Sequence, residues 1–104
     1  MKYSVEISKD AKEDLFSIYR HIAHELLVKD IAHKQIQRLE KAILSLDVMP
    51  ARYRVYDSSK WSDLHMMGVN NYCVFYKIND ATQEVNIVRV LYDGRNFDTI
   101  FNRR

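Results

Sequence analysis

The pattern of apolar and polar residues predicts a strand at the start of the chain. In Lys2–Ile7, the side chains of Tyr3, Val5 and Ile7 share one face, and polar residues occupy the other. A period of two is typical of a strand with one buried face. We therefore expect a half-buried N-terminal strand.

A helix is predicted directly after this strand. Ser8 occupies the position of an N-cap, and the acidic residues Asp10, Glu13 and Asp14 follow it, where negative charge favours a helix N-terminus. Apolar residues then recur at helical spacing, at Leu15, Ile18, Ile22 and Leu26. This spacing predicts a helix over residues 9–27.

A second helix is predicted after a short break at Lys29. Asp30 is its expected N-cap, and Pro50 lies just past its end. Its apolar face consists of Ala32, Ile36, Leu39, Ile43 and Leu46. Two helices with a tight connection form an antiparallel hairpin, which must bury both apolar faces on the rest of the chain.

The second half of the chain predicts a three-stranded antiparallel sheet. Residues 51–63 are irregular and are expected to form a loop. Three strand patterns follow, joined by the turn at Asn70 and Asn71 and the polar loop 79–83: Leu64–Val69, Tyr72–Ile78 and Val85–Tyr92. The short tail 95–104 carries apolar residues that can pack back on the sheet. The fold class expected is therefore α+β, with an N-terminal strand, a two-helix hairpin and this sheet.

Composition is consistent with one domain over residues 1–104. Of these 104 residues, 47% are hydrophobic and 29% are charged, which is typical of a globular chain. The sequence has a single cysteine, Cys73, and no apolar stretch long enough to span a membrane, so we expect a cytoplasmic protein. The formal charge of +2 is too small for a dedicated nucleic-acid-binding domain.

Arginine is the main candidate for chemistry. Arg89 interrupts an apolar strand, where a charge needs either a partner or an open groove. A binding role and an ion pair with an acid such as Asp93 or Asp98 are both open for Arg89 and Arg95. Arg52 and Arg54, like Arg103 and Arg104, could follow a phosphate backbone or contact an acidic partner, or could simply aid solubility.

In motif order and length, the chain resembles the RelE/ParE superfamily of toxins from bacterial type II toxin–antitoxin modules. The residues that carry this resemblance are Ile7–Ala11 with Asp14, Leu15 and Ile18, then Met49-Pro50, Asn71–Tyr76, Val88–Tyr92 and Gly94-Arg95. The resemblance implies a growth-inhibiting toxin, associated with plasmid stabilisation and neutralised by a cognate antitoxin. It implies DNA gyrase or the ribosome with its mRNA as target, and operator DNA as a partner only through the antitoxin.

The two branches of the superfamily differ in their expected residues. RelE-type members cut mRNA on the ribosome, and two of their functional positions fall at Cys73 and Phe101, which lack the expected arginine and aromatic acid/base. The resemblance therefore favours the ParE branch, which inhibits gyrase by binding. A ribosome-dependent endoribonuclease using Arg95, Arg89, His65 and Tyr92 remains an alternative, as does an inactive interaction module. His65, Gly68, Asp93 and Asn96 depart from the ParE pattern.

The binding set expected from the sequence combines arginines with tyrosines, which could line a groove or belong to the core. This set is Arg52, Arg54, Tyr72, Tyr76, Arg89 and Arg95. Neither a metal nor a cofactor is expected. His21, His24 and Glu25 have helical spacing but lack further ligands, and Cys73 is interpreted as a core residue.

Overall fold

The order of elements follows from the sequence pattern, with additions at both ends of the sheet. The computed structural model describes residues 2–25, 27–56 and 63–101. The helical elements are α1 (Lys9–Arg20), π-helical η1 (His21–Glu25), α2 (Lys29–Leu44), 3₁₀-helical η2 (Ser45–Asp47) and η3 (Pro50–Arg52), and α3 (Phe97–Phe101). The strands are β1 (Ser4–Ile7), β2 (Val55–Tyr56), β3 (Leu64–Val69), β4 (Tyr72–Asn79) and β5 (Glu84–Tyr92).

The sheet is mixed and has five strands, in the order β1-β5-β4-β3-β2. The three antiparallel strands β3, β4 and β5 confirm the predicted core of the sheet, but the prediction of a three-stranded sheet was incomplete. β1 pairs with β5 in parallel, with Val5 opposite Val85. β2 lies inside the region expected to be a loop and pairs with β3. Local periodicity identifies a strand but not its distant neighbour, so the parallel pairing was not predictable.

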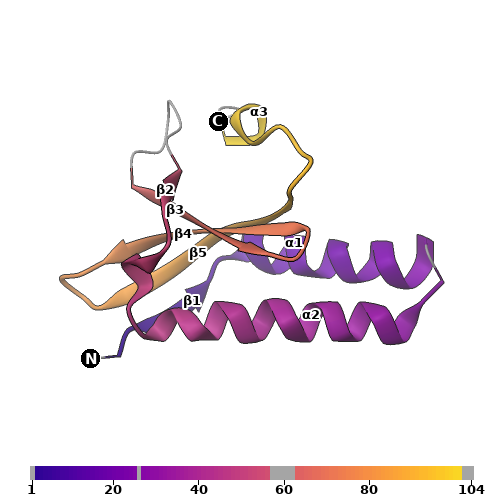
Figure 1. Cartoon of the computed structure of the whole chain (residues 1–104), viewed down its shortest axis with the longest axis horizontal. Helices are drawn as coiled ribbons and strands as arrows, with labels where there is room; N and C mark the ends of the chain where they lie inside the picture. Colours follow the sequence, from indigo (N-terminus) through magenta and orange to yellow (C-terminus); the bar gives the residue numbers. More distant parts are fainter. Residues whose placement is uncertain (1, 26, 57–62, 102–104) are drawn as a thin grey trace.

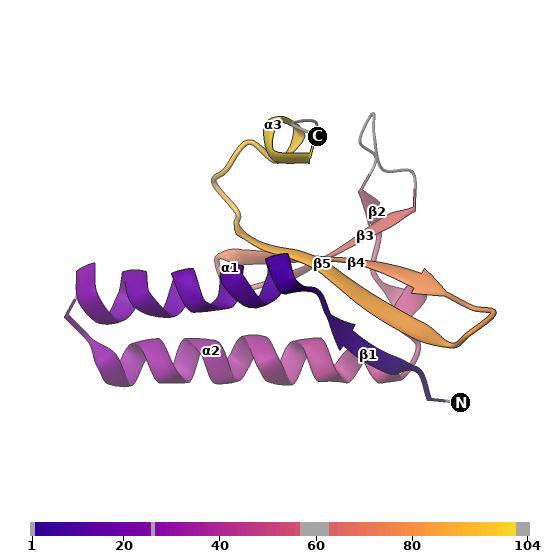
Figure 2. The same ribbon diagram turned by 180° about the vertical axis from the view of Figure 1, so that it is seen from behind.

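Two layers of helix enclose the sheet. α1 and α2 lie side by side against one face, and α3 lies on the opposite side (Figures 1 and 2). The larger core lies under α1 and α2 and includes Leu39, Ile43 and Tyr76, all fully buried. The smaller core lies under α3, where the C-terminal tail packs back as predicted, with Phe75 and Phe101 at its centre.

The first helix begins as predicted and ends differently. The Ser8 Oγ accepts a hydrogen bond from the Ala11 N–H at 3.0 Å, which confirms Ser8 as the N-cap. The α-helical geometry stops at Arg20 and continues as the π-helical turn η1, and Leu27 has a positive φ of 56°. The predicted core position Leu26 lies outside the described residues.

The second helix starts at Lys29, two residues earlier than an N-cap at Asp30 would place it. Its N-cap is Val28, which makes no side-chain capping bond, so the assignment of Asp30 as N-cap was wrong. Asp30 lies in the first turn, where its charge still favours the helix N-terminus. Within the described part of the chain, no helix is long and apolar enough to cross a membrane.

Candidate functional site

A groove lies between the helix pair and the ends of β4 and β5. Its volume is about 750 Å³, within the range of ligand pockets. Ile18, Ile22, Ile31 and Val90 give it an apolar floor. Its polar lining combines residues from α1, η1, α2, the β3–β4 turn, β4, β5 and the turn after β5: Asp14, Ser17, His21, Gln35, Asn71, Tyr72, Arg89, Tyr92 and Arg95.

Two tyrosines form one wall of this groove. Tyr72 and Tyr92 face each other across β4 and β5, and their rings meet edge to face with centroids 5.9 Å apart. Tyr92 is 52% exposed, and burial together with the neighbouring Tyr92 hydroxyl raises the pKa of Tyr72. Gly94 makes room for this arrangement, because a Cβ there would lie 2.8 Å from the Tyr92 ring.

Arg89 is held by an acid that the sequence analysis did not select. The Arg89 Nε and Nη2 donate to the two carboxylate oxygens of Asp14 at 2.7 and 2.9 Å. Asp14 also accepts the Val90 N–H at 2.9 Å, so one carboxylate joins α1 to the backbone of β5. The hydrogen bond to Asp14 is the main cause that raises the pKa of Arg89. Asp93 was therefore wrong as the suggested partner of Arg89, and the side chain of Asp98 lies outside the described part of the chain.

Arg95 is the groove arginine without such a partner. It is exposed in the turn after β5, and its backbone N–H donates to the Tyr92 carbonyl at 3.1 Å. Its guanidinium makes no ion pair with any described residue. A carboxylate or phosphate of a partner can therefore bind it without displacing an internal contact.

His65 and Tyr76 lie in a different part of the molecule. His65 lines a second hollow, of about 840 Å³, near η3 and the β4–β5 loop. Its Nδ1 lies 2.9 Å from the Tyr53 carbonyl, and its ring stacks on Tyr76. Tyr76 is fully buried and donates its hydroxyl to the Pro50 carbonyl, so it is not presented to a partner. The proposed catalytic set is thus divided, with Arg89, Tyr92 and Arg95 at one groove and His65 at another.

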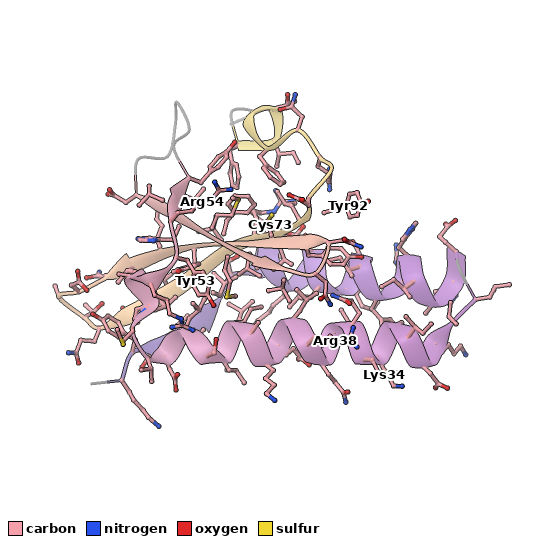
Figure 3. All side chains as sticks on the ribbon, viewed as in Figure 1. Lys34, Arg38, Tyr53, Arg54, Cys73 and Tyr92 are labelled. Atoms are coloured by element: carbon pink, nitrogen blue, oxygen red, sulfur yellow. The ribbon has the colours of Figure 1, made fainter. Side chains whose placement is uncertain are left out.

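Arg52, in η3, and Arg54, directly before β2, have different surroundings. Arg52 donates to the carbonyls of Ser45, Val48 and Met49, which satisfies acceptors at the end of the second helix. Its guanidinium also lies 4.8 Å from the Tyr53 ring centroid. These contacts give Arg52 a structural role. Arg54 is exposed and lies on the side of the sheet that α3 covers (Figure 3).

The positions equivalent to the RelE-type functional residues are apolar and buried. Cys73 and Phe101 are each 4% exposed and belong to the core under α3. Burial, together with the hydrogen bond that the Cys73 thiol donates to Asp93, raises the pKa of Cys73 to about 11. The Phe101 ring packs against Phe75 with centroids 4.9 Å apart. Neither position offers a group that exchanges a proton near neutral pH.

The sequence matches a known protein family over most of its length. The model of the ParE toxin of the type II toxin–antitoxin system parDE matches residues 5–97. The chain belongs to the ParE toxin family. This membership confirms the resemblance seen in the sequence motifs, and the matched region contains every lining residue of the groove.

Solved toxins of the superfamily share the fold of this ParE-family chain. A chain of the chromosomal ParDE system from P. aeruginosa has a TM-score of 0.73 at 17% identity and covers 88% of this chain and 96% of its own length. The RelBE2 complex from Mycobacterium tuberculosis gives 0.64 at 20% identity, with coverage of 88% and 99%. The RelE–RelB complex from Pyrococcus horikoshii gives 0.61 at 21%, with 92% and 100%. No curated protein matches the sequence significantly.

Sequence reasoning missed Asp14 and Gln35 at the groove. Asp14 was explained by the helix N-terminus, and only the fold brings it to Arg89. Gln35 carried a signal that could have been used, because it lies on the buried face of α2 between Ala32 and Leu39. A polar residue on an apolar helical face requires a reason. No group of three or more metal-ligating side chains occurs among the described residues, and those residues include His21, His24 and Glu25.

Proposed function

We propose that this toxin arrests growth by binding a protein target, with DNA gyrase as the target suggested by the ParE branch. Membership of the ParE family supports this choice. The burial of Cys73 and Phe101 supports it further, because RNA cleavage needs a base and an acid at the scissile phosphate. The structure carries apolar packing at the two positions where the nuclease branch has functional side chains.

We also propose that a cognate antitoxin neutralises the toxin by occupying the groove. The solved ParDE, RelBE2 and RelE–RelB structures are toxin–antitoxin systems or complexes, which supports an antitoxin partner for this chain. An apolar floor, two tyrosines and Arg95 suit a peptide segment that carries both apolar and acidic side chains. Operator DNA would then be reached only through the antitoxin.

A ribosome-dependent endoribonuclease is the second candidate. Its support is the meeting of Arg89, Tyr92 and Arg95 at one groove, together with folds shared with RelE toxins. Its weakness is that Arg89 already pairs bidentately with Asp14, which leaves Arg95 as the available phosphate clamp.

Induced expression in bacteria separates these functions. Plasmid supercoiling and total mRNA integrity are followed in the same samples, with the empty vector as control. Loss of gyrase supercoiling or double-strand breaks, with intact mRNA, is the expected result. Rapid mRNA cleavage that requires translation would reject the binding mechanism in favour of the nuclease. Normal growth with folded protein present would identify an inactive interaction module.

A further inference from the structure

The side-chain amide of Gln35 has unused hydrogen-bonding capacity inside the groove. Gln35 lies on α2 and is only 8% exposed. Its Oε1 accepts a hydrogen bond from the Asn70 Nδ2 at 3.1 Å, across the gap between α2 and the β3–β4 turn. Its Nε2 is buried and has no hydrogen-bond partner among the described residues. Half of this amide is therefore satisfied and the other half is not.

This unsatisfied donor makes the free chain less stable than an apolar residue would. A buried N–H without an acceptor loses its hydration and gains nothing in return. A methionine or leucine side chain of similar size would fill the same space without that loss. The amide is thus better suited to a complex, in which an acceptor is supplied, than to the free chain.

The groove can supply that acceptor when it is occupied. Gln35 already lines the groove, together with Arg95 and the tyrosine pair. The last torsion of a glutamine side chain is broad, so a rotation can turn Nε2 towards a group in the groove. The contact with Asn70 limits this rotation, since the Asn70 turn fixes the position of the other amide atom.

We propose that Gln35 is a specificity-determining residue that donates a hydrogen bond to a carbonyl or carboxylate oxygen of an acidic peptide segment in the groove. Charge favours this occupant, because the Arg95 guanidinium has no ion-pair partner in the described part of the chain, whereas Arg89 is neutralised by Asp14. The inference rests on the proposed function, in which this segment belongs to the antitoxin. Gln35 would then set the register of the segment, since an apolar group beside it leaves the amide unpaired.

The test compares Gln35→Met with Gln37→Met. Gln37 lies on the same helix but is exposed, so it controls for the change of side chain. The antitoxin used is the protein co-produced from the toxin's own operon, separated from the toxin in urea and then added back to each refolded variant. Affinity is measured by calorimetry, and the stability of each free variant is measured by urea unfolding.

Gln35→Met should weaken antitoxin binding about tenfold, the loss expected for one hydrogen bond, while the free variant is at least as stable as the parent. Gln37→Met should leave both quantities unchanged. In the parent complex, the NMR signals of the Gln35 side-chain NH₂ should shift and become protected from exchange with water. Gln35→Leu serves as a second variant should methionine pack poorly.

The other outcomes are distinguishable. Equal affinity of Gln35→Met, Gln35→Leu and the parent would overturn the inference while leaving the proposed function intact. A loss of stability in both variants, with binding unchanged, would assign Gln35 a purely structural role and also overturn it. If the parent chain itself fails to bind the antitoxin, the proposed function fails.

Discussion

The bond between Asp14 and Arg89 can be tested by a double-mutant cycle. Arg89→Met removes the guanidinium and keeps an unbranched side chain. Asp14→Asn removes the charge and keeps an oxygen that can accept the Val90 N–H, which lies 2.9 Å from the carboxylate. The cycle therefore isolates the ion pair from the helix–strand contact.

The expected coupling follows from geometry and exposure. Two charge-assisted hydrogen bonds of 2.7 and 2.9 Å would each contribute roughly 1.5–3 kcal/mol when fully buried. The side chains of Arg89 and Asp14 are 23% and 13% exposed, so water screens part of this energy. We expect a coupling of about 2 kcal/mol, well above that of a surface ion pair.

The single variants should differ in a characteristic way. Arg89→Met leaves a poorly hydrated carboxylate and should cost about 3 kcal/mol. Asp14→Asn should cost less, about 1–2 kcal/mol, because Asp10 and Glu13 lie close enough to keep a favourable charge on Arg89. Glu13→Gln, at an exposed position, should change stability by no more than about 0.5 kcal/mol.

Urea unfolding in low salt measures all four members of the cycle. A coupling below about 0.3 kcal/mol would mean that the two side chains act independently and would refute the pairing. If Arg89→Met were as stable as the parent but no longer arrested growth, Arg89 would be a functional residue and its structural explanation would be wrong.

Three further predictions address function, packing and pH. Arg95→Ala should weaken growth arrest or antitoxin binding without lowering the unfolding free energy, and Arg95→Lys should recover part of the loss; full activity of the alanine variant would exclude a contact there. Leu39→Ala should cost about 2–5 kcal/mol in urea unfolding, whereas exposed Leu44→Ala should cost about 0.5 kcal/mol or less; similar costs would contradict the packing of α2. Burial raises the pKa of Tyr76 from 10.0 to about 12, so the folded state favours the neutral phenol. This contribution to the unfolding free energy is complete below about pH 10 and falls as the pH rises to 12. The Tyr76→Phe variant should therefore lose less unfolding free energy than the parent between about pH 10 and pH 12. An identical pH dependence would show that Tyr76 does not titrate with unfolding.

Local pattern predicted the elements of this fold better than their neighbours. Ser8 was found from its place before an acidic turn, and the two helices were found from their apolar spacing. The π-helical turn η1 was not, because it continues the same apolar face with a different hydrogen-bond pattern. β2 is only two residues long and depends on pairing with β3, so its sequence carries almost no signal.

The groove was predicted in part. Tyr72, Tyr92 and Arg95 come from two strands and one turn that the sequence placed next to one another, so their meeting follows from the hairpin. Asp14 reaches Arg89 only because β1 pairs beside β5 and brings the start of α1 to the same edge. For Tyr76 the sequence allowed either a groove or a core position. Its hydroxyl donates to the Pro50 carbonyl in η3, so the ring belongs to the core.

The parallel contact between β1 and β5 also sets the order in which the sheet can form during synthesis. Ser4 lies opposite Glu84, so β1 has no strand neighbour until the ribosome has added about 80 further residues. At roughly 5–20 residues per second, this interval is on the order of ten seconds. Arg95 and the groove come later still. The groove therefore cannot be complete until Arg95 has been made, even though its first lining residue, Asp14, is made early.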